Sequence, residues 1–324
     1  PDQFTRYPVE SYLAGLLDAL DATVRGTASP RAGAKGTPLA RAGATQLIMS
    51  RISFLVPDIS SNVLWATTAL ARGLAGGHRV EIVGPDFGAG VFPPCRGQFD
   101  YHAVPVRRLY RWPDFAWESR AIMQAVTGDV IVAIKAFMDT VPLALRLKKQ
   151  RGARVIVYLD EWDGAVYRQM TPAGRLQCWL RHFQHPLDDC YAPWVERMIP
   201  KADAVVSTST FLQRKFGGRV VPLGVDMEVF KPQAPEGTAA LRRTLGLERQ
   251  KLVVFAGMVR PHKGVGTILD ALARIGNPDY RLLIVGPETE YLRELVGNRT
   301  YGAYIHYAGM QPRAAIPGYL DLAD

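Results

Sequence analysis

The sequence predicts an α/β protein with two domains, each built on a parallel sheet. The first observation is an alternation of β-branched runs with segments of helical periodicity, which is typical of βαβ units. The second is that this alternation restarts after "VPLGVDMEVFKP", near residue 230. The third is size, since 324 residues with 48% apolar side chains exceed the usual length of one domain and can fill two cores.

The N-terminal region is set apart from both domains by its composition. Residues 8–25 have helical spacing, whereas residues 26–44 are rich in Gly, Ala, Pro and Arg and have no period. We therefore expect a helix and a flexible linker over residues 1–44. The helical stretch carries three acidic residues, which a secretory signal would not tolerate. No apolar run approaches the roughly 20 residues that cross a bilayer, and the three cysteines form no C-x-x-C pair. We expect a cytoplasmic protein.

Residues 45–229 are predicted to form the first domain. The run "QLIMSRISFLV" reads as a strand and precedes a helix with Val63, Thr67, Leu70 and Leu74 on one face, which "HRVEIVG" follows as a second strand. The remaining predicted strands are 129–134, 153–159, 203–207 and 219–222, and the remaining helices are about 115–126, 138–150 and 208–216.

Residues 230–324 are predicted to form the second domain, so that the chain reads as two Rossmann-like halves. "KLVVFAG", "YRLLIVG" and "YIHYAG" are its predicted strands, and helices are expected after each, at 265–275, 288–297 and 312–322. Three strands are fewer than a typical doubly wound sheet contains. We therefore expect this second domain to be incomplete.

One turn of the second domain has the composition of an anion site. In "GMVRPHKG" Arg260 and Lys263 stand between glycines, directly after a predicted strand and before a predicted helix. The spacing matches neither a P-loop nor a dinucleotide fingerprint. Two cations beside a helix N-terminus nevertheless suit a diphosphate, with the guanidinium binding two oxygens and the ammonium acting as a point charge. A solvated loop whose cations only keep it soluble is the alternative.

Four segments in order resemble one enzyme family. "VPLGVDMEVFKP", "FAGMVRPHKGVGTILDAL", "YRLLIVG" and "AGMQPRAAIPGYLDLAD" resemble the nucleotide-sugar half of the GT-B glycosyltransferases, specifically the large retaining family four. "ADAVVSTSTFLQRKFG" is similar to the family segment just upstream. The resemblance implies a GT-B fold of two Rossmann-like domains. It also implies transfer of a glycosyl group from a nucleotide-diphosphate sugar, with retention and without a metal or other cofactor.

The resemblance also assigns residues by position. It implies that Arg260, Lys263 and Gly264 bind the donor diphosphate. It further implies that the cleft between the domains is lined by Gly224, Val225 and Asp226.

The sequence departs from the family pattern in three places. Met258 stands where many members have arginine, and Leu223 replaces a common asparagine. The family's pair of glutamates, which meets the donor sugar and the ribose, is expected one strand after "LDLAD", where the sequence given stops. We therefore expect a fragment of a longer enzyme.

Polar residues at the predicted strand ends of the first domain are further candidates. Ser60 and Ser61 follow the first strand and either line the cleft or cap the next helix. Lys135 follows another strand and is either a second diphosphate contact or a lysine that extends its ammonium to water. Asp160 and Glu161 stand where many family members carry a histidine near the reacting sugar. They are the catalytic candidates, with helix capping and solvation as the alternative.

Residues 182–190 contain two histidines, two aspartates and a cysteine that resemble metal ligands. Without a second matched pair, this pattern favours a polar helix end, and no metal is expected.

Two segments, 106–120 and 175–183, interleave arginine with aromatic residues. Such mixtures suit a peripheral contact with the inner face of an anionic membrane, or recognition of an acidic acceptor. They also suit a segment that buries its apolar face in the core and exposes its arginines to solvent. The net charge of +9 favours anionic partners in general. No recognition-helix or RNP-type pattern accompanies it, so nucleic acid is not an expected partner.

Two other functions remain open at this point. A nucleotide-sugar epimerase would use the same fold but needs an acid set that the sequence does not identify. A non-catalytic nucleotide-sugar-binding module is favoured by the glutamate pair that the sequence given lacks. The expected partners are a nucleotide-sugar donor and an acceptor whose identity the sequence does not indicate.

Overall fold

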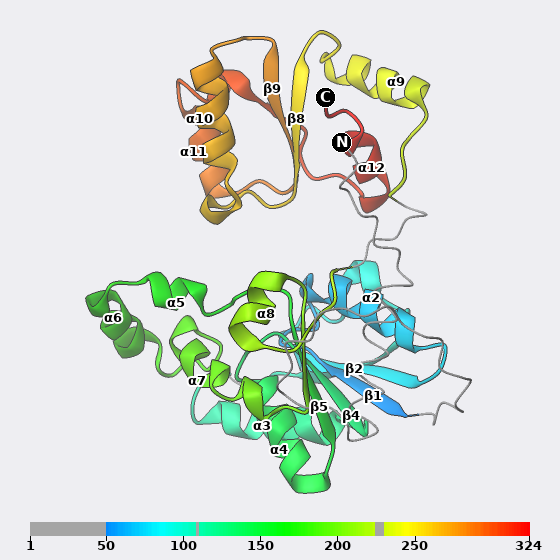
Figure 1. Ribbon diagram of the computed structural model, residues 1–324, viewed down its shortest axis with the longest axis vertical. Helices are drawn as coiled ribbons and strands as arrows, with labels where there is room; N and C mark the ends of the chain where they lie inside the picture. Colours follow the sequence, from blue (N-terminus) through cyan, green and yellow to red (C-terminus); the bar gives the residue numbers. More distant parts are fainter. Residues whose placement is uncertain (1–49, 108–109, 224–229) are drawn as a thin grey trace. The chain divides into compact units, whose positions relative to one another are not determined.

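The computed structural model describes residues 50–107, 110–223 and 230–324. The chain divides into two compact units, Pro1–Gly224 and Val225–Asp324, and each is described by itself (Figure 1). The predicted helix and linker of residues 1–44 and the predicted cleft residues Gly224, Val225 and Asp226 lie outside the described residues.

The first unit is built on a seven-stranded parallel sheet with the strand order β3-β2-β1-β4-β5-β6-β7. The strands are β1 Arg51–Leu55, β2 Arg79–Asp86, β3 Asp100–Pro105, β4 Val130–Ile134, β5 Arg154–Leu159, β6 Ala204–Ser207 and β7 Arg219–Val220. The parallel sheet confirms the predicted α/β class. The sequence did not predict β3, which lies at the edge of the sheet.

Helices cover both faces of this sheet (Figure 1). They are α2 Val63–Leu74, α3 Asp114–Ala125, α4 Val141–Arg151, α5 Ala165–Gln169, α6 Pro172–His182, α7 Ala192–Glu196 and α8 Thr210–Phe216. The sequence predicted α2, α3, α4 and α8. It did not predict α5 to α7, which form an insertion between β5 and β6.

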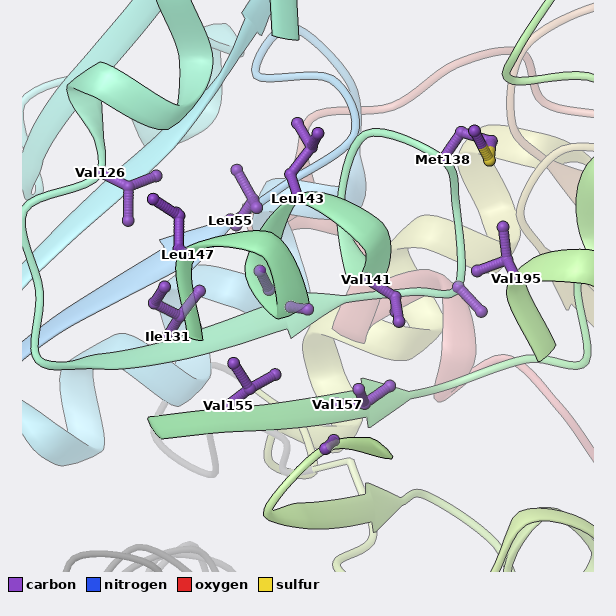
Figure 2. Packing of buried hydrophobic residues seen from close by; sticks show 14 of the residues in the cluster. Leu55, Val126, Ile131, Met138, Val141, Leu143, Leu147, Val155, Val157 and Val195 are labelled. Carbon is purple, nitrogen blue, oxygen red and sulfur yellow. The ribbon is translucent and has the colours of Figure 1, made fainter. Parts of the chain in front are cut away.

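Alternation along each strand divides the core into two layers. On β4, Ile131 and Ala133 pack with α3 and α4, while Val130, Val132 and Ile134 face the layer that contains the apolar side of α2. Figure 2 shows the first of these layers. All five β4 side chains are buried, as expected for a central strand of a parallel sheet with helices on both faces.

The second unit contains a three-stranded parallel sheet with the order β10-β9-β8. Its strands are β8 Lys251–Ala256, β9 Tyr280–Val285 and β10 Ile305–Tyr307, and its helices are α9 Pro235–Leu245, α10 Val265–Ile275, α11 Glu290–Gly297 and α12 Ile316–Leu320. The three strands and the helices after them confirm the predicted alternation. One apolar cluster joins β9 to α10 and α11, and another joins the sheet to residues of α9 and α12.

None of the helices that the structure describes is long and apolar enough to cross a lipid bilayer.

Candidate functional site

The turn after β8, where the sequence predicts an anion site, is bounded by two glycines with positive φ. Gly257 has a φ of 146° and Gly264 a φ of 76°, backbone conformations that other residues rarely adopt. A Cβ built on Gly286, at the end of β9, would lie 2.1 Å from the carbonyl oxygen of Gly257. Glycine at 286 is therefore what allows the turn after β8 to approach the end of β9.

The same turn is fixed by one buried residue and one threonine. Val259 is fully buried, and Thr289 Oγ1 donates a hydrogen bond of 2.9 Å to its carbonyl oxygen. Arg260 directly follows Val259, Lys263 is the last residue of the short 3-10 turn Pro261–Lys263, and both side chains are exposed. A rigid backbone thus carries two solvent-accessible cations directly before the first turn of α10.

The electrostatics of this turn favour an anion. Gly264 is the N-cap residue of α10, whose first turn carries no acidic side chain, so the N-terminal dipole is not neutralised locally. Within the described chain, Arg260 forms no ion pair with a carboxylate, and its Nε donates a 3.2 Å hydrogen bond to the sulfur of Met258. The predicted diphosphate role of Arg260, Lys263 and Gly264 stays a prediction that this geometry suits.

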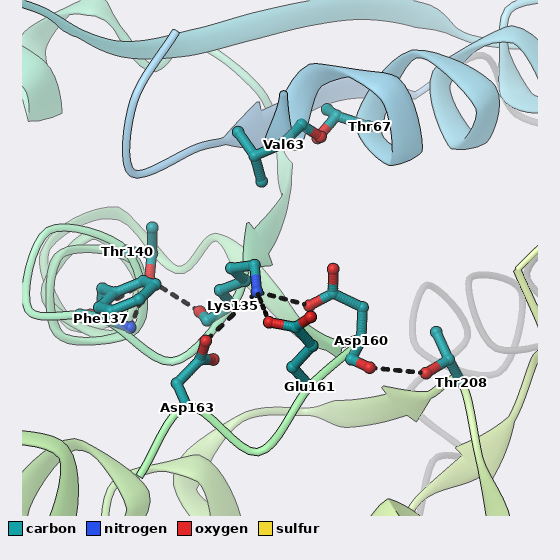
Figure 3. Close-up of polar contacts among 9 residues, drawn as sticks. All are labelled: Val63, Thr67, Lys135, Phe137, Thr140, Asp160, Glu161, Asp163 and Thr208. Atoms are coloured by element: carbon teal, nitrogen blue, oxygen red, sulfur yellow. Dashed lines mark hydrogen bonds and ion pairs between the residues drawn. The ribbon is translucent and has the colours of Figure 1, made fainter. Parts of the chain in front are cut away.

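A second group of charges lies at the carboxyl ends of β4 and β5 in the first unit (Figure 3). The Nζ of Lys135 lies 3.1 Å from Asp160, 3.1 Å from Glu161 and 3.2 Å from Asp163. Only 15% of the Lys135 side chain is exposed. The ammonium is therefore held among carboxylates, and the alternative of a lysine that extends to water is wrong.

Burial and charge oppose each other in this cluster. Burial alone would lower the pKa of Lys135, but the three carboxylates outweigh it and raise the pKa above its usual value. Burial raises the pKa of Asp163, and Lys135 offsets only part of that rise. Three carboxyl groups thus surround one ammonium, so the acids outnumber the base. This environment favours a role for Lys135 in holding the carboxylates, and its predicted contact with the diphosphate stays untested.

The backbone around Lys135 explains its position. Its φ is 64°, a left-handed value that is uncommon outside glycine. Lys135 N donates to the carbonyl of Tyr158 on β5 at 2.9 Å, and Thr140 Oγ1 donates to the Lys135 carbonyl at 2.8 Å. These two bonds fix the turn on both sides, so the ammonium is directed across the end of β5 (Figure 3).

Asp160 and Glu161 do not cap a helix. The N-cap of α5 is Gly164, without a side-chain bond, so the capping alternative is wrong for both acids. The solvation alternative stays open for Glu161, whose side chain is 60% exposed. Thr208, after β6, donates from Oγ1 to the carbonyl of Asp160 at 3.1 Å. Side chains from the ends of three neighbouring strands thus meet at one edge of the sheet, where α/β proteins bind ligands.

The serines after β1 make local bonds. Ser60 Oγ donates to Asp58 Oδ1 at 2.6 Å, and Ser61 Oγ donates to the Asp58 carbonyl at 3.0 Å. The N-cap of α2 is Asn62, which forms no side-chain cap bond, so the expected capping by Ser60 or Ser61 is wrong. Whether the two serines line a cleft stays a prediction.

Asp139, which the sequence analysis did not single out, is fully buried beside the turn after β4. Burial raises the pKa of its carboxyl to about 8, and the nearby Asp58 also raises it. A 3.0 Å hydrogen bond from Tyr110 Oη lowers this pKa but does not outweigh the burial. A strongly perturbed acid at the ligand-binding edge of a sheet marks a functional candidate. The available signal was its position, an acid directly after a buried strand.

The raised pKa of Asp139 predicts that the protein loses stability as pH rises. The folded carboxyl keeps its proton up to about pH 8, whereas the unfolded one releases it near its ordinary pKa of 3.8, so unfolding releases a proton between these two pH values. We expect Asp139→Asn to remove several kcal/mol of this pH dependence, measured by chemical denaturation from pH 4 to pH 9. Asp129→Asn, which removes an exposed carboxylate, is the control, and equal slopes for wild type and Asp139→Asn would contradict the assignment.

The first unit also contains a cavity of about 770 Å³ that is lined mostly by the insertion between β5 and β6, together with Trp112 and Met138. Its charged lining residues are all arginines, Arg168, Arg175 and Arg197, and no acidic side chain lines it. Its aromatic lining consists of Trp112, Tyr167, Trp179, Tyr191 and Trp194. Arg168 is paired with the buried carboxylate of Glu196 at 2.6 Å, and Arg175 donates to the carbonyls of Tyr167 and Arg168. The cavity therefore suits an anionic ligand with a flat or apolar part.

Comparison with known proteins assigns the chain to a family. The pattern described as "Glycosyl transferase 4-like domain" matches residues 63–225, about half of the chain. The pattern described as "Glycosyl transferases group 1" matches residues 238–324. The chain belongs to the group 1 glycosyltransferases.

One curated relative of this glycosyltransferase chain is a D-inositol 3-phosphate glycosyltransferase of Segniliparus rotundus, 41% identical over 70 residues. The match covers 21% of this chain and 15% of the relative. The chain therefore matches less than a fifth of the length of that relative.

Solved structures agree with the GT-B fold that was predicted for this glycosyltransferase chain. Alr3699/HepE of Anabaena in complex with UDP is 16% identical, with a TM-score of 0.60, covering 85% of this chain and 72% of that chain. The catalytic domain of starch synthase IV from Arabidopsis thaliana, bound to ADP and acarbose, is 14% identical, with a TM-score of 0.55, covering 86% and 77%. At these identities the likeness concerns the fold.

Proposed function

We propose that this protein transfers a glycosyl group from a nucleotide-diphosphate sugar to an acceptor, with retention and without a catalytic metal. The observation that carries the proposal is the rigid, glycine-bounded turn that presents Arg260 and Lys263 before the N-terminus of α10. Family membership and the UDP, UDP-glucose and ADP bound by similar structures support it.

The two cations supply the charge that the reaction needs. Cleavage of the bond between sugar and phosphate leaves a nucleoside diphosphate, and negative charge grows on its oxygens as the bond breaks. Arg260 and Lys263, aided by the backbone at Gly264, stabilise that charge, and they do so without a metal.

The acidic cluster of the first unit serves the sugar and the acceptor. Asp160 and Glu161 orient an acceptor hydroxyl or stabilise positive charge on the sugar ring, and Lys135 fixes both carboxylates. Glu161 is 60% exposed on its side chain, whereas Asp163 is 11% exposed. Glu161 is therefore the more accessible of these carboxylates for contact with a substrate.

The acceptor carries an anionic group in this proposal. The cavity in the insertion offers three arginines and no acid, together with aromatic surfaces on which a ring or an apolar chain can pack. A phosphorylated or otherwise acidic acceptor fits that lining better than a neutral one.

Contact with an anionic membrane is a related proposal. On α6, Leu176, Trp179 and Leu180 are exposed, and Phe183, which directly follows the helix, is exposed as well. Arginines accompany these apolar residues in the same segment. Apolar side chains flanked by arginine suit the interface of an acidic lipid surface.

Titration calorimetry in buffer containing EDTA tests the proposed function. We expect the protein to bind one of UDP, ADP and GDP, together with the matching nucleotide sugar, with no need for a divalent cation. Release of nucleoside diphosphate on adding acceptor mixtures would then report transfer. Binding without release would favour a non-catalytic nucleotide-sugar-binding module, conversion of the donor sugar alone would favour an epimerase, and no binding of any nucleotide would contradict all three.

A further inference from the structure

Two cysteines and an aspartate meet where the insertion folds back on α6. Cys178 lies on α6, and Cys190 lies in the 3-10 turn Asp189–Tyr191. The Sγ of Cys178 lies 3.3 Å from Asp188 Oδ1, and the two sulfurs and a carboxylate oxygen all lie within 4.8 Å of one another. Both cysteines are buried, and Asp188 is partly exposed.

The local fold produces this meeting. After α6 ends at His182, a turn forms with bonds from His185 N to the His182 carbonyl and from Asp188 N to the His185 carbonyl, at 2.7 and 3.0 Å. Asp188 then serves as the N-cap of the 3-10 turn and accepts from Cys190 N at 3.4 Å. The chain therefore returns to α6 with Cys190 beside Cys178.

His182 adds a fourth donor at the rim of this group. It lies four residues after Cys178, on the same face of α6. Its Nδ1 lies 3.1 Å from Asp188 Oδ2. Two sulfurs, a carboxylate and an imidazole thus come from two short segments, with the imidazole on the exposed side.

We propose that Cys178, Asp188 and Cys190 bind a Zn²⁺ ion, with His182 as the fourth ligand. Thiolate, imidazole and carboxylate are the ligands that zinc takes in four-coordinate structural sites. Sulfur and oxygen atoms a little over 3 Å apart are already near the spacing that a shared ion would impose.

A cation also resolves the chemistry of the buried group. The Cys178 sulfur lies 3.3 Å from Asp188 Oδ1, and both cysteines are buried. A bound divalent ion stabilises the thiolate form of each cysteine. It also compensates the electrostatic repulsion between the thiolates and the nearby carboxylate. Without an ion, the same residues would form a buried hydrogen-bonded group or, under oxidation, a disulfide.

The ion is a structural one in this proposal. Trp179, Cys190 and Tyr191 line the aromatic cavity, so the ion would join two elements of the cavity wall. It takes no part in the transfer step, for which we propose no metal. Cys190 also lines the cavity, which gives the ion a route to the site.

Metal content and cobalt substitution of the full chain test the proposal. We expect about one zinc per chain by elemental analysis, and a thiolate-to-cobalt charge-transfer absorption after exchange with Co²⁺. Cys178→Ser and Cys190→Ser should each abolish the absorption. Cys95→Ser is the matched control, because Cys95 is a buried cysteine in a different part of the core, 3.8 Å from Thr68 Oγ1, and the absorption should persist.

His182→Ala keeps the test valid if Cys178→Ser and Cys190→Ser, which change buried residues, fail to fold. The His182 side chain is 45% exposed, so its loss leaves the core intact, and we expect zinc affinity to fall at least about tenfold. Three results would each overturn the proposal. The first is three freely titrating thiols with no cobalt absorption, and the second is a disulfide between Cys178 and Cys190 in the purified protein. The third is undiminished zinc in folded Cys178→Ser.

Discussion

Replacing Arg260 and Lys263 together by alanine is expected to weaken nucleoside-diphosphate binding at least about tenfold. Charge-assisted hydrogen bonds contribute roughly 1.5 to 3 kcal/mol each, and a tenfold change in affinity corresponds to about 1.4 kcal/mol. The backbone at this turn is set by Val259, Thr289 and the glycines, so truncating two exposed side chains removes charge without changing the fold. Titration calorimetry with the nucleotide that binds the wild type measures the loss.

Two arginines away from the proposed site provide the control for the loss of positive charge. Arg274, in the last turn of α10, and Arg299 are both exposed residues of the second unit. Arg274→Ala with Arg299→Ala removes the same two charges away from the proposed site, and its affinity should stay close to that of the wild type at physiological salt. Equal affinity of the Arg260/Lys263 variant and the wild type would remove the diphosphate assignment.

Lys135→Met is expected to lower the free energy of unfolding by about 3 to 5 kcal/mol. The substitution removes the ammonium that lies 3.1 to 3.2 Å from three carboxylates and puts no cation in its place. Asp163, with 11% of its side chain exposed, pays most of this cost because water reaches it least. Urea denaturation at pH 7 measures the free energy of unfolding.

The pH dependence of the Lys135→Met defect separates charge from packing. Without the ammonium, the pKa values of the carboxylates rise in the folded state, so the folded variant binds more protons than the unfolded chain at mildly acidic pH. Its deficit relative to wild type should therefore shrink as pH falls toward 4. Glu161→Gln added to Lys135→Met should recover part of the loss at pH 7. A deficit that is constant across pH would contradict the electrostatic explanation.

The sequence predicted the elements whose side chains have a clear period. Central strands such as β4 are buried on both faces, so they appear as unbroken β-branched runs, and α10 carries a regular apolar stripe. β3 is an edge strand whose residues are mostly half-buried, and none of the α9 residues is buried, so neither shows a strong pattern. The five-residue helices α5 and α7 are too short to show a helical period.

The site was predicted in part for a similar reason. Arg260 and Lys263 are neighbours in the chain, so their spacing alone suggested a shared ligand. Lys135, Asp160 and Glu161 were each identified at strand ends, but their mutual contacts depend on the parallel pairing that sets Ile134 beside Tyr158. Asp139 was missed because its raised pKa comes from burial and from Asp58, a residue far away in sequence, and neither can be read from the residues next to it.

The close approach of β8 and β9 has a practical consequence for engineering. Any side chain at 286 would displace the Gly257 carbonyl and with it the loop that follows. Position 286 should therefore tolerate no variation in a mutant library selected for donor use, although it contributes no functional group of its own. Met258 is 43% exposed and its sulfur accepts from Arg260, so attempts to alter substrate preference should vary position 258 and keep 286 unchanged.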